Sequence, residues 1–174
     1  MDRSDPAYIV YIADKIAAAA DRRDSETQAG GFDAKKPLAS VFNLLNGNKG
    51  AMNFAGTLLE GSDDSINYPS SENTTIPQGF YSKALSKLTQ TLKALQWTEP
   101  WLNSLLTSLE SVASFVPSST SNKEVADISL YDHVKITAAV ASCIQQYLEG
   151  EQDLRGRLLE GAEDFYREKA FMLH

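Results

Sequence analysis

Apolar residues recur at every third or fourth position in several long stretches of the chain, which is the spacing of amphipathic helices. The first stretch covers residues 4–24, where Ser4 or Asp5 can cap the helix and Pro6 suits its first turn. Its expected inward stripe consists of Ile9, Ile12, Ala13, Ile16 and Ala20. Further helices are predicted at residues 80–95, 98–116, 130–148 and 151–167. The pattern therefore predicts a mainly α fold.

The pattern is weaker between the first helix and residue 79. A short helix beginning at Pro37, with Val41, Phe42 and Leu45 inward, should end at the turn residues 46–50. Residues 51–60 can form a short strand, residues 61–79 read as a polar loop, and residues 118–127 read as a linker. Together with an apolar stretch at 170–173, these breaks predict divisions at residues 1–45, 46–79, 80–168 and 169–174.

Composition narrows the functional classes. The 174 residues carry a net charge of −7, with scattered basic residues, so the chain by itself is a poor candidate for a nucleic-acid binder. A single cysteine excludes an internal disulfide framework and indicates a reducing cytoplasm. No apolar run approaches the ~18 residues that a membrane span needs, and the N-terminus lacks a signal-peptide pattern.

Asp14 is the first candidate for chemistry. It lies in the middle of the first predicted helix, and its helical neighbours three and four residues away are not basic. A buried aspartate here would need a tertiary partner, a water-filled cleft or a metal ion, because an unpaired buried charge is costly. The alternative is that this line of the helix faces solvent.

Asp132 and His133 open the helix predicted at 130–148. Ser129 is a good N-cap, and Asp132, three residues later, can complete a capping box, so we expect Asp132 to be structural. The positive end of the helix disfavours a protonated His133, and neutral imidazole is the form that binds metals. The alternative for His133 is a core histidine bonded to a backbone carbonyl.

Three stretches carry a family resemblance: "YIVYIADKIAAAADRR", "PLASVFNLL" and the long "SFVPSSTSNKEVADISLYDHVKITAAVA". They resemble the large signature subunit of type III-A (Csm-type) CRISPR interference complexes. The resemblance implies that the chain is an interior part of a longer protein. Residues 1–45 and 80–168 would then belong to a circularly permuted HD phosphohydrolase domain, with a loop-rich insertion at 46–79 that can contain β-structure. Residues 169–174 would begin the first palm-like domain.

In a permuted HD domain the order of ligands is His-Asp, then Asp, then His. By position, Asp14 matches the last aspartate and His133 matches the relocated histidine, while Ser129 and Asp132 have supporting or capping roles. The His-Asp dyad would lie upstream of this chain. The resemblance therefore implies a divalent-metal site, of the manganese, nickel, magnesium or cobalt class, that is incomplete here, and an inert fragment with no catalytic residues of its own.

The parent would resemble a single-strand DNA nuclease and a synthase of cyclic oligoadenylates from ATP. Its implied partners are the other complex subunits, the guide RNA and single-strand DNA, without a membrane, and the fragment could self-associate through exposed apolar surface. Two alternatives stay open. The chain could be a helical scaffold that docks the palm domains and subunits, or a small acidic helical protein that binds a partner.

One spatial expectation follows. The first helix and the helix at 130–148 should pack through Ala17, Ala138 and Ala141, which would bring Asp14 and His133 together. Two ligands of one ion lie within roughly 3–5 Å of each other.

Overall fold

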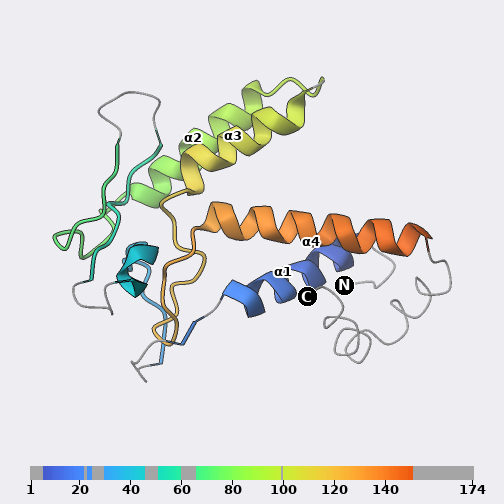
Figure 1. Ribbon diagram of the computed structural model, residues 1–174. Coiled ribbons are helices and arrows are strands. Elements are labelled where there is room, and N and C mark those ends of the chain that lie inside the picture. Colours follow the sequence, from blue (N-terminus) through green and yellow to red (C-terminus); the bar gives the residue numbers. More distant parts are fainter. Residues whose placement is uncertain are drawn as a thin grey trace. The chain divides into compact units, whose positions relative to one another are not determined.

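The computed structural model describes residues 6–21, 23–24, 30–45, 51–59, 66–98 and 100–150. Within these ranges the helices are α1 (Ala7–Asp21), the 3-10 helix η1 (Val41–Leu44), α2 (Phe80–Ala94), α3 (Trp101–Ala113) and α4 (Leu130–Gly150) (Figure 1). The predicted mainly α fold is confirmed. The helix expected at 151–167 and the apolar stretch at 170–173 lie outside the described residues.

The chain divides into two compact units. The terminal unit comprises Met1–Asp21 and Val134–His174, and the central unit comprises Arg22–His133. The helix α4 begins in the central unit and continues into the terminal unit. The domain boundaries predicted at residues 45, 79 and 168 stay predictions.

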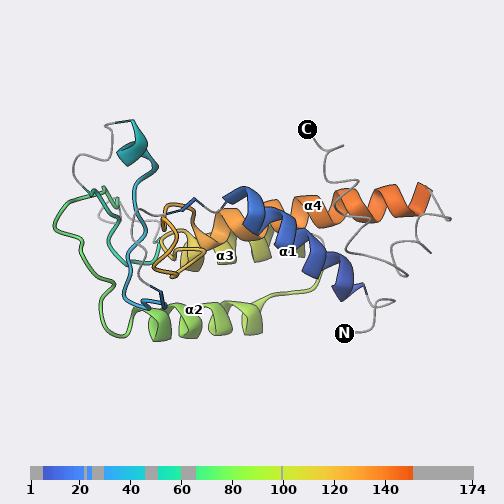
Figure 2. The same ribbon diagram turned by 90° about the horizontal axis from the view of Figure 1, so that it is seen from below.

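In the terminal unit, α1 lies near the middle of α4 in both views (Figures 1 and 2). The buried residues of α1 are Ile12, Ala13, Ala17 and Ala18, whereas Ala20 is exposed rather than inward. On α4, Leu148 is buried and Ala141 is half-buried, but Ala138 is exposed. Leu148 follows Ala141 by two helical turns and shares its side, while Ala138 points about 80° away from Leu148.

The central unit is built around the paired helices α2 and α3. Its hydrophobic core combines side chains of these helices with two loop residues and consists of Leu58, Ile76, Phe80, Ala84, Val112 and Ala113. Gly79 precedes α2 with a φ of 83°, a backbone conformation that glycine adopts without strain. Phe80 and Ala84 contribute to this core from α2, and Val112 and Ala113 contribute from α3. Leu85 and Leu102 on the same helices are exposed.

Extended segments surround this core without forming a described strand. The predicted strand at 51–60 is an extended segment with one bridging residue, Asn53, which pairs with Ala39 on one side and Ser70 on the other. The segment at 118–127 is not a passive linker, because bridges hold Ser121 to Phe32 and Glu124 to Asp24. These contacts fix irregular backbone through single hydrogen-bonded pairs instead of continuous ladders.

The short helix η1 corrects another expectation. Val41, Phe42 and Leu45 were predicted to point inward, but all three are exposed. The inward contact is made by Asn43, whose side-chain amide donates to the Met52 carbonyl and accepts from the Met52 N–H, at 2.9 and 3.1 Å. The face of this four-residue helix that is turned toward the protein therefore carries the side-chain amide of Asn43.

Candidate functional site

The start of α4 is fixed by a serine cap. The Ser129 hydroxyl accepts a hydrogen bond from the Asp132 N–H (3.0 Å) and donates one to the Asp132 carboxylate (2.7 Å). The Leu130 N–H donates to the Val116 carbonyl (2.6 Å), which ties the first turn to the end of the α3 region. The Asp132 carboxylate therefore completes the cap, as expected of an acid in the first helical turn.

His133 follows directly on this capped turn. Its N–H donates to the Ser129 carbonyl (3.0 Å), and its side chain is half-buried. His133 thus belongs to the first turn of α4. His133 is the last residue of the central unit.

Asp14 lies in the middle of α1, in the terminal unit. It is exposed, although Ala13 and Ala17 beside it are almost completely buried. Asp14 is thus at the edge of the buried face of α1 rather than within it. Because Asp14 and His133 belong to different units, their convergence on one ion stays a prediction.

Asp14 and His133 fit a divalent site in chemical type, since carboxylate oxygen and neutral imidazole nitrogen are ordinary ligands of such ions. Within the part of the chain that the structure describes, no group of three or more His, Cys, Asp or Glu side chains is placed to hold a metal ion. A complete coordination shell would therefore draw on ligands other than the described groups of this chain.

No described helix has the length and apolar character of a bilayer span.

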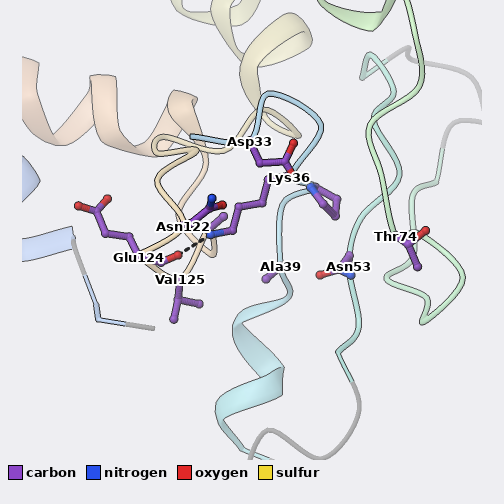
Figure 3. A pocket seen from close by; sticks show the side chains of 10 residues that line it. Asp33, Lys36, Ala39, Asn53, Thr74, Asn122, Glu124 and Val125 are labelled. Atoms are coloured by element: carbon purple, nitrogen blue, oxygen red, sulfur yellow. Dashed lines mark hydrogen bonds between the residues drawn. The ribbon is translucent and has the colours of Figure 1, made fainter. Parts of the chain in front are cut away.

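The central unit also contains an open pocket of about 500 Å³ (Figure 3). Its lining combines Asp33, Lys36, Asn53 and Asn122 with backbone of the segment around Glu124. The Lys36 ammonium donates to the Ser121 and Glu124 carbonyls, at 2.8 and 2.6 Å. Burial lowers the pKa of Lys36, and the charges of Asp33 and Glu124 oppose this effect. Lys36 therefore links its own segment to the segment that contains Ser121 and Glu124.

Sequence reasoning missed a partly buried ion pair whose acid, Asp127, directly follows the pocket residue Ala126. Asp127 is 5% exposed and pairs with the guanidinium of Arg23, whose side chain is 38% exposed. Burial raises the pKa of the Asp127 carboxyl above its usual range, while Arg23 and hydrogen bonds act in the opposite direction. The available signal was an acid between the apolar residues Ala126 and Ile128, where a linker needs none.

Comparison of the sequence with known proteins identifies the class of protein to which this chain is similar. No family model matches the chain. Three curated relatives are each a "CRISPR system single-strand-specific deoxyribonuclease Cas10/Csm1 (subtype III-A)". Identity is 38% over 174 residues for Mycobacterium tuberculosis, 38% over 180 for Enterococcus italicus and 35% over 175 for Streptococcus thermophilus. The alignments cover 96–97% of this chain but 21–24% of the relatives.

A solved structure agrees with these relatives. A chain of the crystal structure of the Csm1–Csm4 cassette in complex with cA4 matches 77% of this chain with a TM-score of 0.51 and 29% identity. The match covers 15% of that chain. The chain belongs to the Cas10/Csm1 family of type III-A systems and spans about a fifth to a quarter of its curated relatives, so the predicted family is confirmed.

Proposed function

We propose that this chain is part of the nuclease domain of a type III-A CRISPR large subunit, which cuts single-stranded DNA when full length. The observation that carries the proposal is 35–38% identity, over nearly the whole chain, to three single-strand-specific deoxyribonucleases. The proposed setting is the cytoplasm, in a complex with other effector subunits and guide RNA. Cyclic oligoadenylate synthesis is proposed for the palm domains of the parent.

In this proposal Asp14 and His133 each contribute one ligand to a divalent-metal site. A bound ion would lower the pKa of a water molecule and stabilise negative charge on the phosphate. The chain's own contribution is orientation. The Ser129–Asp132 cap fixes the first turn of α4, and this turn sets the position of the His133 backbone. The upstream His-Asp dyad would supply the remaining ligands, so the 174-residue chain alone is expected to be inert.

The first prediction concerns His133 and Asp14 in the full-length subunit. His133→Gln and Asp14→Asn should each lower Mn²⁺-dependent cleavage of a single-stranded oligonucleotide roughly 100-fold or more, because losing a ligand exceeds the 10–100-fold effects of outer-shell changes. Both variants should also weaken Mn²⁺ binding measured by calorimetry. Cleavage rates are measured by gel assay at saturating subunit.

Asp132→Asn is the matched control, because Asp132 directly precedes His133 and the amide oxygen of an asparagine can still accept the hydrogen bond from the Ser129 hydroxyl. It should retain cleavage within a few-fold. If Asp132→Asn abolishes cleavage while His133→Gln does not, the assignment of the ligand is wrong. If neither His133→Gln nor Asp14→Asn alters cleavage or Mn²⁺ affinity, the proposed site itself is wrong.

A second candidate function is a helical scaffold that docks the palm domains and neighbouring subunits. The specific observation is that the solved neighbour is one chain of a two-protein cassette. A scaffold role predicts that Asp14→Asn and His133→Gln leave both complex assembly and metal-dependent cleavage intact. The third alternative, an independent acidic regulator, is replaced by the family membership.

A further inference from the structure

The short helix η1 exposes an apolar cluster to solvent. Val41, Phe42, Leu44 and Leu45 are 47%, 66%, 48% and 82% exposed, and we call these four side chains the η1 knob. Single exposed apolar residues are ordinary, but contiguous clusters are not. The η1 knob exposes on the order of 500 Å² of surface, which is the size of the largest apolar patch on a typical monomer, and such patches are often functional.

Hydrogen bonds of Ser40 and Asn43 fix the backbone that carries the η1 knob. Ser40 is 2% exposed, donates its N–H to the Met52 carbonyl at 2.9 Å and accepts the Phe42 N–H on its hydroxyl at 3.3 Å. The Asn43 side chain forms its two hydrogen bonds with the Met52 backbone. The polar groups of this turn are thus satisfied on its inner side, and the apolar groups point outward. A fixed knob loses little conformational entropy when it docks.

The apolar side chains of the η1 knob favour a protein surface as the binding partner. Residues 37–45 contain no charged side chain, in a chain with 22% charged residues. A phosphate backbone would be recognised by lysine or arginine, which this segment lacks. An apolar recess lined by aliphatic and aromatic side chains is complementary to Phe42 and Leu45 instead.

The size of the knob then selects between a separate partner and a tethered one. A stable interface between separate proteins buries about 800 Å² on each partner, more than the η1 knob offers, so a second copy held by the knob alone would dissociate. Covalent linkage supplies an effective concentration in the millimolar range and makes a small contact sufficient. The curated relatives are four to five times longer than this chain, since the alignments cover 21–24% of them, so such linked surface exists in the family.

We propose that the η1 knob docks into an apolar recess on the remainder of the full-length large subunit, outside residues 1–174. The contact would anchor the central unit to the rest of the polypeptide. It rests on the family membership and not on nuclease activity, so it can fail while the proposed metal site holds, and the reverse.

The first test places a benzophenone amino acid at position 42 of the full-length subunit. Illumination should give a cross-link within the same polypeptide, to a peptide that lies outside residues 1–174 and is rich in apolar residues. Cross-links to a second copy, to another effector subunit or to nucleic acid would overturn the proposal. So would the absence of any cross-link at position 42 and at position 45 labelled in the same way.

The second test makes Phe42→Asp in both the 174-residue chain and the full-length subunit. In the shorter chain the melting temperature should change by less than about 1 °C, because the side chain is already largely solvated. In the full-length subunit, hydrogen exchange of the amides at 41–45 should accelerate about tenfold or more. Equal effects in the two chains, or none in the longer one, would contradict docking.

Leu85→Asp is the matched control, because Leu85 on α2 is also 66% exposed. It should leave exchange at 41–45 unchanged in both chains. Leu45→Asp, at the most exposed position of the knob, should reproduce the result of Phe42→Asp and separates docking from any folding defect particular to position 42.

Discussion

Lys36 joins parts of the central unit that are far apart in sequence. Its ammonium bonds two carbonyls in a segment 85 and 88 residues further along the chain, and Figure 3 shows the side chain reaching toward this segment. Burial lowers the pKa of Lys36, so holding the charge there has a cost that the two hydrogen bonds offset. We therefore assign Lys36 a structural role.

Lys36→Met should lower the free energy of unfolding by about 1–3 kcal/mol, because the apolar stem is kept while two hydrogen bonds from a charged donor are lost. Urea unfolding at neutral pH measures the change. Lys35→Met is the control, since Lys35 is exposed. A loss for Lys35→Met as large as for Lys36→Met would show that charge, and not the two hydrogen bonds, accounts for the effect.

Asp127 predicts an unusual pH dependence. Because burial raises its pKa, the folded protein binds this proton more tightly than the unfolded chain does. The contribution of Asp127 to stability therefore falls as the pH rises from about 4, its usual pKa, through the raised value in the folded state. Between pH 7 and pH 4, the wild type should gain stability relative to Asp127→Asn, as measured by urea unfolding across this range.

Asp24→Asn is the control for this comparison, since Asp24 is an exposed carboxyl beside Arg23. The wild type should show no such gain relative to Asp24→Asn. The opposite slope for Asp127→Asn would mean that the attraction of Arg23 outweighs burial and holds the Asp127 pKa below its usual value.

At the scale of elements, the cap of α4 makes a separate prediction. Ser129→Ala removes the acceptor of the Asp132 N–H and the donor to the Asp132 carboxylate, and should cost about 1–2 kcal/mol of stability. Thermal unfolding followed by circular dichroism measures the loss, and hydrogen exchange should locate it at residues 130–133. Thr91→Ala, which removes an exposed hydroxyl bonded within α2, should cost far less.

The elements that the sequence predicted well are those determined by local periodicity. The stripes of α2 and α3 repeat over several turns, and each turn adds evidence for the same buried face. The orientation of η1 could not be predicted in this way. It depends on Asn43 finding the Met52 backbone nine residues later, and no periodic pattern in four residues carries that information.

At the scale of the whole molecule, the family could be recognised from three sequence stretches and the mainly α fold from the helical periodicity, and both are confirmed. The candidate site was predictable only residue by residue. Asp14 and His133 came from positional resemblance, and their meeting stays a prediction. The Arg23–Asp127 pair was missed because its members are 104 residues apart, and long-range partners leave no mark on local spacing.

The paired hydrogen bonds between Asn43 and Met52 have a consequence for how this family can vary. They clamp the two ends of the segment between these residues, so the backbone outside the clamp does not depend on what lies within it. Lengthening a closed loop is inexpensive, about 0.6 kcal/mol for each doubling. Insertions should therefore be tolerated between Leu45 and Met52, beyond the last residue of the η1 knob, and an epitope tag can be placed there.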